Sequence, residues 1–98
     1  MASYKLAQRA ESKLVEIYAF TEINFGRYQA DAYRTGFEQT FELLASFPRI
    51  GRSADEVRHG YRRFRYQAHY IFYTEEADHV LIRTILHTGQ NLRPELFD

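Results

Sequence analysis

The residues best suited to chemistry lie between Arg62 and His87, in the segment RRFRYQAHYIFYTEEADHVLIRTILH. Metal-free RNA cleavage requires a general base, a general acid and cations that stabilise a pentavalent phosphate. Arg65, Arg83 and His87 could supply the cations and one proton-transfer group. The sequence places no obvious second proton-transfer group beside them, so the set is incomplete as an RNA-cleaving site.

Two other interpretations of the same segment stay open. Arginine and aromatic side chains on exposed strands are typical of surfaces that bind another protein, where Tyr and Arg dominate the binding energy. Alternatively, Arg63 and Arg65 face solvent and pair across the strands with Glu75, Glu76 and Asp78. Exposed pairs of that kind contribute typically less than about 1 kcal/mol.

Other kinds of active site find little support in the sequence. The four histidines (His59, His69, His79 and His87) show neither HxxxH nor HExxH spacing, which predicts hydrogen-bonded histidines near the sheet edge and no metal site. No GxSxG or GxxxxGK[ST] motif is present. The chain has no cysteine, which excludes disulfides, thiolate metal sites and thiol catalysis. We therefore expect neither a metal nor a cofactor.

Charge is balanced overall and uneven along the chain. Lys and Arg total 13, as do Asp and Glu. Residues 49–69 hold six arginines against Asp55 and Glu56, a local charge of +4. A neutral total argues against a dedicated nucleic-acid binder, whereas the basic middle suits phosphate or an acidic protein. The N-terminus does not look like a signal peptide and no apolar run reaches membrane-spanning length, so a cytoplasmic protein without membrane contact is expected.

Two helices are predicted before these strands. Apolar residues recur at spacings of three and four in both segments, and Gly26 and Pro48 are placed to end them. The buried stripe of the first is predicted as Ala10, Leu14, Ile17, Tyr18, Thr21 and Phe25, and that of the second as Ala30, Tyr33, Phe37, Phe41 and Leu44. Gly36 adjoins the second stripe, which indicates close approach of the neighbouring helix.

Strands are predicted on both sides of this helical hairpin. Ser3–Ala7 precedes it, and Tyr61–Gln67, His69–Thr74 and His79–Leu86 follow the loop Phe47–Gly60. In the last strand we expect Val80, Ile82 and Leu86 to alternate with Leu81, Arg83 and Ile85. The order β-α-α-β-β-β predicts an α+β fold, with the hairpin packed on one face of a small, mainly antiparallel, twisted sheet and one domain over residues 1–98.

Four segments together resemble the ParE toxins of bacterial type II toxin–antitoxin modules, within the RelE/ParE superfamily. They are LAQRAESKLVEIYAFTEINFG, LLASFPRIGRSADEVRHGYRRF, HYIFY and LIRTILH, and the resemblance extends from residue 4 to about 92. It implies the same β-α-α-β-β-β fold. It also implies a toxin that poisons DNA gyrase by binding, has no catalytic residues, and is neutralised by a ParD-like antitoxin.

For these two partners, the local charge and the apolar positions of the hairpin indicate separate contact surfaces. We expect Arg62, Arg63, Arg65, Arg83 and His87 to contact gyrase. The antitoxin has a disordered segment that folds on binding, and we expect it to contact a free strand edge and apolar positions on the outside of the hairpin: Val15, Tyr18, Phe20, Tyr28 and Tyr33. The alternative is a ribosome-dependent mRNA endonuclease of the RelE type, with Arg65, Arg83 and His87 as its catalytic set.

Overall fold

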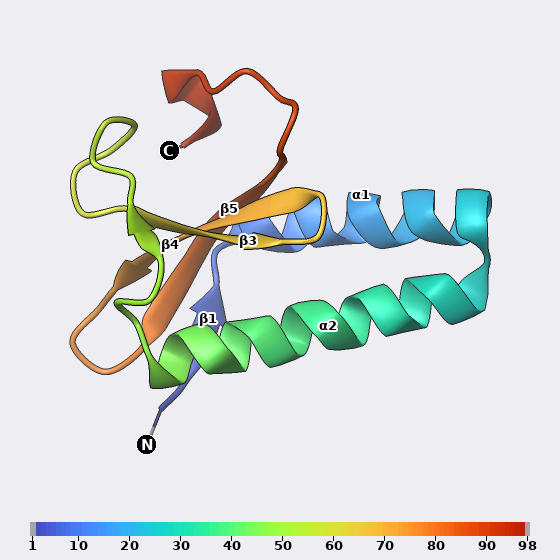
Figure 1. Ribbon diagram of the computed structural model, residues 1–98, viewed down its shortest axis with the longest axis horizontal. Helices are drawn as coiled ribbons and strands as arrows, with labels where there is room; N and C mark the ends of the chain where they lie inside the picture. The colour runs from blue at the N-terminus through green and yellow to red at the C-terminus, as the bar shows by residue number, and fades with distance from the viewer. Residues whose placement is uncertain (1, 98) are drawn as a thin grey trace.

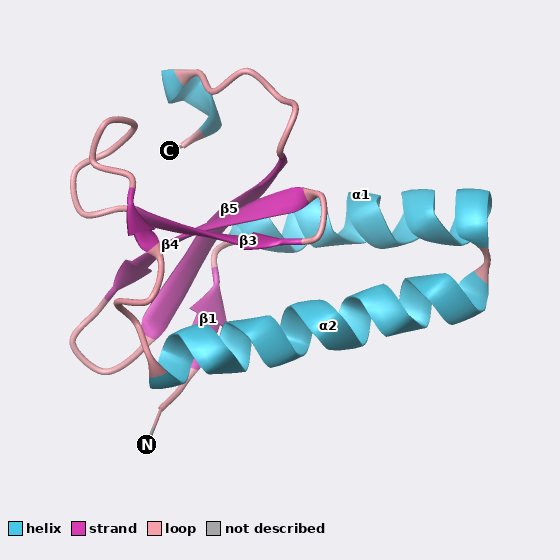
Figure 2. Cartoon of the chain, viewed as in Figure 1, coloured by secondary structure: helices cyan, strands magenta, loops and turns pink. Residues whose placement is uncertain are grey.

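A computed structural model describes residues 2–97 as a five-stranded sheet with a helical hairpin on one face (Figures 1 and 2). The predicted α+β fold is confirmed. The elements are β1 (Tyr4–Leu6), α1 (Gln8–Phe25), α2 (Arg27–Ser46), β2 (Arg52–Ser53), β3 (Arg62–Tyr66), β4 (His69–Glu75), β5 (Val80–His87) and a 3-10 helix (Pro94–Leu96).

The two helices pack their predicted apolar stripes against the sheet. In α2 the side chains of Phe37, Phe41 and Leu44 are fully buried, and in α1 Ala10 and Leu14 join them. Figure 1 shows the hairpin running past the end of the sheet, so that its tip projects from the rest of the molecule. No helix among the described residues has the length and apolarity needed to cross a membrane.

One member of the predicted α1 stripe is wrong, and so is the reason given for Gly36. Phe25 is 66% exposed because it lies at the projecting tip, where no strand is available to cover it. A Cβ on Gly36 would clash with the hydroxyl oxygen of Tyr66 on β3. The close neighbour of this glycine is therefore the sheet, not helix α1.

The sheet has the order β1-β5-β4-β3-β2. The three C-terminal strands form the predicted antiparallel meander, while β1 pairs with β5 in parallel at one edge. At the other edge the two-residue strand β2 pairs with β3. The sequence placed β2 in a loop because two residues are too few to show alternation.

A β-bulge in β5 changes which side chains face the helices. Phe72 pairs with Thr84 and Tyr73 pairs with Ile82, so Arg83 has no partner residue on β4. The extra residue reverses the alternation beyond it. Ile85 therefore joins Val80 and Ile82 in the core beneath the helices, and Leu86 faces the opposite side, which corrects the predicted pattern.

The face of the sheet away from the helices is covered in part by the C-terminal segment. Phe97 is buried there against Tyr61 and Phe72, with ring centroids 6.2 Å and 4.8 Å away. The Tyr61 hydroxyl donates to the Phe97 carbonyl oxygen at 3.1 Å. Both faces of the sheet are thus packed, and the candidates Arg63, Arg65 and Arg83 lie on the face that carries this second core.

Candidate interaction surfaces

The five residues predicted to form one basic surface are divided between the two faces of the sheet. Side chains alternate along a strand, and on β3 the residues Phe64 and Tyr66 pack toward the helices. Arg63 and Arg65 consequently face the other way, together with Tyr61. Arg62 shares the side of Phe64, and its Nη1 donates to the Gly51 carbonyl oxygen at 2.9 Å, which ties the loop before β2 to the sheet.

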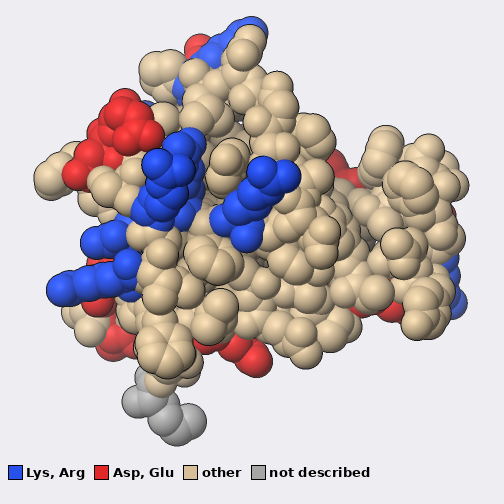
Figure 3. Space-filling model, in the orientation of Figure 1, with Lys and Arg blue, Asp and Glu red and all other residues tan. Residues whose placement is uncertain are grey.

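Arg63 and Arg65 belong to a basic surface that also includes Arg52. Arg52 is the cross-strand partner of Arg63 in the β2–β3 pair, so both side chains emerge on the same face. We call Arg52, Arg63 and Arg65 the arginine patch. The Arg63 guanidinium lies 4.9 Å from the centroid of the Tyr70 ring, and Arg65 Nε donates to the Gln67 carbonyl oxygen at 2.8 Å. Figure 3 shows basic side chains gathered over β2 and β3.

The predicted ion pairs between the arginines of β3 and the acidic turn after β4 do not form. Glu75 accepts instead from Arg49 Nε at 3.2 Å. Glu76 lies 3.6 Å from Arg83 Nη2. The acids of this turn therefore pair with arginines outside the patch, and Arg63 and Arg65 are left without them.

Arg83 is held by the fold itself. Besides the ion pair with Glu76, its Nε donates to the Thr74 hydroxyl at 3.1 Å, and Thr74 in turn donates to Glu76 at 2.6 Å. Its guanidinium also lies 5.7 Å from the Tyr61 ring centroid. These contacts position the bulge residue over the second core, close to but distinct from the arginine patch.

His87 lies on the helix side of the sheet, opposite Arg65 and Arg83. It pairs with His69 across β4 and β5, and the two rings are 5.5 Å apart at 88°. The Gly89 N–H donates to its Nδ1 at 3.0 Å. The residues considered for RNA cleavage therefore lie on two faces of the sheet, with Arg65 and Arg83 on one and His87 on the other. The bulge at Arg83 contributes to this separation because it reverses the alternation before His87.

His69 is a partly buried, uncharged histidine. The Tyr33 hydroxyl and His69 Nδ1 are 2.6 Å apart. Burial, together with the nearby His87, lowers the pKa of His69 to about 4. Burial also raises the pKa of Tyr33, so both groups are neutral near pH 7. Among residues 2–97 no three His, Cys, Asp or Glu side chains come together to hold a metal.

An apolar groove lies between the hairpin and the end of the sheet that carries the two histidines. Its volume is about 870 Å³, and we call it the hairpin groove. Two of the five residues expected to contact the antitoxin, Phe20 and Tyr33, line this groove, together with residues outside that set. These include Ile17, Phe25, Tyr66, His69 and His87.

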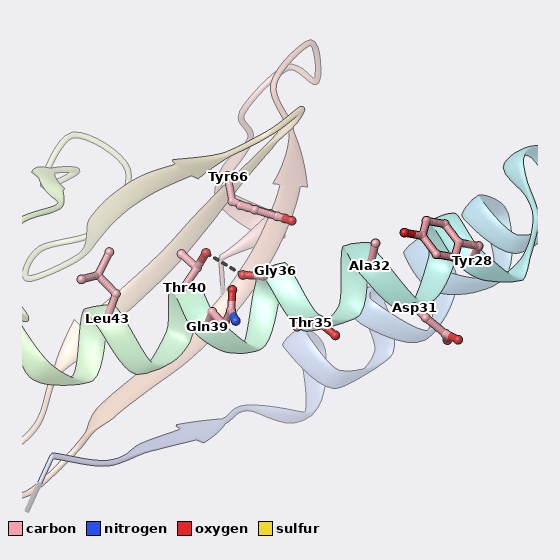
Figure 4. A pocket seen from close by; sticks show the side chains of 9 residues that line it. All are labelled: Tyr28, Asp31, Ala32, Thr35, Gly36, Gln39, Thr40, Leu43 and Tyr66. Carbon is pink, nitrogen blue, oxygen red and sulfur yellow. Dashed lines mark hydrogen bonds between the residues drawn. The ribbon is translucent and has the colours of Figure 1, made fainter.

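The remaining antitoxin candidates lie elsewhere on the hairpin. Tyr28 lines a shallower depression along α2 toward Tyr66, shown in Figure 4. Val15 and Tyr18 line a third depression beside α1. Tyr18 is half-buried beneath the Arg34 guanidinium, which lies 4.4 Å from its ring centroid, and burial raises its pKa to about 12. The helical spacing predicted on which face of its helix each residue lies, but not where the sheet packs against the helices. The sequence therefore could not show that these residues line three different depressions.

Residues 4–92 match the sequence model of a family described as the ParE toxin of the type II toxin–antitoxin system parDE. The chain belongs to this family. The resemblance drawn from the four sequence segments is thereby confirmed, and the chain is a ParE-type toxin.

Relatives of this ParE-type chain align over most of its length. A protein named Toxin ParE1 from Caulobacter vibrioides is 33% identical over 96 residues, covering 98% of this chain and 99% of the relative. Another Toxin ParE1, from Mycobacterium tuberculosis, is 37% identical over 70 residues, covering 71% of each. A solved structure described as a chromosomal ParDE system from P. aeruginosa superposes with a TM-score of 0.76. It covers 89% of this chain and 96% of the solved chain at 17% identity, which shows a shared fold.

Proposed function

We propose that this ParE-type toxin binds DNA gyrase and poisons it, while breaking no bond itself. Family membership over residues 4–92 supports a toxin. The observation that carries the binding mechanism is the separation of Arg65 and Arg83 from His87 by the sheet. Phosphodiester cleavage needs acid, base and cations around one phosphate, and a set divided between two faces is unsuited to it.

Poisoning by contact requires the toxin to prefer one state of its target. A toxin with equal affinity for every gyrase state would shift no equilibrium. We therefore propose that it binds best to the covalent gyrase–DNA intermediate, so that DNA breaks persist. The arginine patch is the proposed contact, since Arg83 is engaged with Glu76 and His87 lies on the groove side. The site of action is then the cytoplasm, where the chromosome and gyrase are.

A ParD-like antitoxin is proposed to neutralise the toxin by covering the hairpin groove. The groove is apolar, and exposed rings of Phe20 and Phe25 border it, which suits apolar side chains from a segment that folds on binding. The solved P. aeruginosa relative is described as a ParDE system, which supports a partner of this class. Phe20→Glu should weaken co-purification with the antitoxin encoded beside this gene, whereas Gln8→Glu, on the same helix outside the groove, should not.

The gyrase proposal is tested with purified toxin, gyrase and plasmid DNA. Wild-type toxin is expected to inhibit supercoiling and to accumulate cleaved DNA. The double variant Arg63→Glu with Arg65→Glu should lose at least about tenfold in potency, the size of effect of about 1.4 kcal/mol in binding. Arg27→Glu, a charge reversal at the hairpin tip, serves as the control and should retain potency.

Two results would contradict the proposal. One is full gyrase poisoning by a folded double variant. The other is cleavage of ribosome-bound mRNA by the purified wild-type chain, lost on changing His87 to Ala, which would establish the RelE-type alternative. Thermal unfolding of each variant separates loss of the surface from loss of the fold.

A further inference from the structure

Like charges face one another at the centre of the arginine patch. Arg52 and Arg63 are direct cross-strand partners, on strands about 4.8 Å apart. Like charges in such a pair destabilise a sheet. Of the ion pairs formed within residues 2–97, none joins Arg52, Arg63 or Arg65 to an acid.

Three acids near the patch are engaged by other groups. Asp55 accepts from the Gly60 N–H at 2.7 Å, and this hydrogen bond is the main reason that its pKa is lowered. Glu75 and Glu76 pair with Arg49 and Arg83, as described above. The three charges of the patch are therefore available to an external anion.

Arg63 also carries an unused donor. Its Nε is buried and makes no hydrogen bond to any described residue, although its guanidinium is stacked on Tyr70. Buried donors nearly always have a partner, and those that lack one call for an explanation. An acceptor that arrives with a ligand, after a small rotation of the side chain, would supply that partner.

We propose that the arginine patch contacts the phosphate backbone of the DNA that gyrase holds, and this inference rests on the proposed gyrase target. Arginine binds phosphate through two parallel N–H donors, and duplex DNA carries about one charge per 1.7 Å of helix axis. A dense and fixed polyanion suits three closely spaced cations better than an acidic protein surface does. The net charge of zero gives little long-range attraction, so gyrase must bring the DNA to the toxin.

The experiment compares binding of fluorescently labelled toxin to gyrase alone and to gyrase loaded with a DNA duplex, over a range of salt concentrations. The patch variant carries Arg52→Gln, Arg63→Gln and Arg65→Gln. The matched control loses three arginines elsewhere: Arg27→Gln, Arg34→Gln and Arg93→Gln. Each lost phosphate contact should reduce the magnitude of the slope of log affinity against log salt concentration by about 0.9. The slope of the patch variant should therefore be smaller by roughly 2–3, and the slope of the control should be unchanged.

The possible results test the phosphate contact of the patch separately from the proposed gyrase target. DNA loading should strengthen binding of wild type and control but not of the patch variant. If the patch variant loses equal affinity for gyrase with and without DNA, the patch binds an acidic protein surface and the inference is overturned. An unchanged salt slope also overturns it.

A third result concerns the target. If wild-type toxin fails to inhibit gyrase, the proposed function fails, and binding to the bare duplex at low salt then decides the inference. Weaker duplex binding by the patch variant than by the control, with the expected change in salt slope, supports phosphate as the ligand. Equal duplex binding by the two variants overturns the inference.

Discussion

The Tyr73 hydroxyl anchors the loop that leads to Arg52 of the arginine patch, and removing this hydroxyl tests that role. Tyr73 is fully buried on β4. Its hydroxyl accepts from the Gly51 N–H at 2.9 Å and donates to the Pro48 carbonyl oxygen at 2.8 Å. Both partners precede β2, so this one group holds in place the segment that presents Arg52 beside Arg63.

Tyr73→Phe should lower the free energy of unfolding by about 2–5 kcal/mol. Two hydrogen bonds contribute about 1 kcal/mol each, and the Gly51 N–H stays in the interior without an acceptor, which adds a penalty of about 1–3 kcal/mol in the worst case. For a domain of this size, a loss of about 2 kcal/mol lowers Tm by roughly 8–16 °C.

Urea unfolding followed by circular dichroism measures this loss. Tyr70→Phe is the matched control on the same strand, because the Tyr70 hydroxyl makes no hydrogen bond within the described part of the chain. It should change stability by less than about 0.5 kcal/mol. Amide exchange at Gly51 should accelerate in Tyr73→Phe alone. A Tyr73→Phe variant as stable as the control would show that the hydroxyl does not anchor the loop.

Three further predictions concern the helix face, the second core and pH. Gly36→Ala should destabilise the fold by about 1–3 kcal/mol, measured by urea unfolding. Alanine has the better helix propensity, but its methyl group would displace Tyr66. A more stable variant would contradict the close contact. Phe97→Ala should cost about 3–5 kcal/mol by calorimetry, and an effect below about 1 kcal/mol would mean that the C-terminal segment is not packed. Since the pKa of His69 falls from 6.5 to about 4 on folding, stability should decrease as pH drops from about 6.5 to 4, and His69→Gln should flatten this part of the profile.

Much of the architecture could be predicted from local patterns. The spacing of Phe37, Phe41 and Leu44 determined both the helix and the face it buries, because a helix repeats every 3.6 residues whatever it packs against. Gly26 and Pro48 marked the helix ends for equally local reasons. The four segments that resemble ParE toxins identified the family, and the family comparison confirms it.

The arrangement of the candidate residues in space was harder to predict from the sequence. The alternation of side chains along the strand predicted that Arg63 and Arg65 share one face of the sheet. It could not predict the hydrogen bond from Arg62 to Gly51 or the ion pair between Arg83 and Glu76. The exposure of Phe25 and its position at the hairpin groove depend on how far the sheet extends beneath the helices.

The sequence by itself determined the helices, the meander strands and the family, since each depends on neighbours within a few residues or on whole motifs. The tertiary structure decided the bulge at Arg83, the pairing of Arg52 with Arg63 and the second core around Phe97. Each of these joins residues distant in sequence, and their register depends on closing loops and packing side chains across the whole sheet. That register places His87 on one face and the arginine patch on the other.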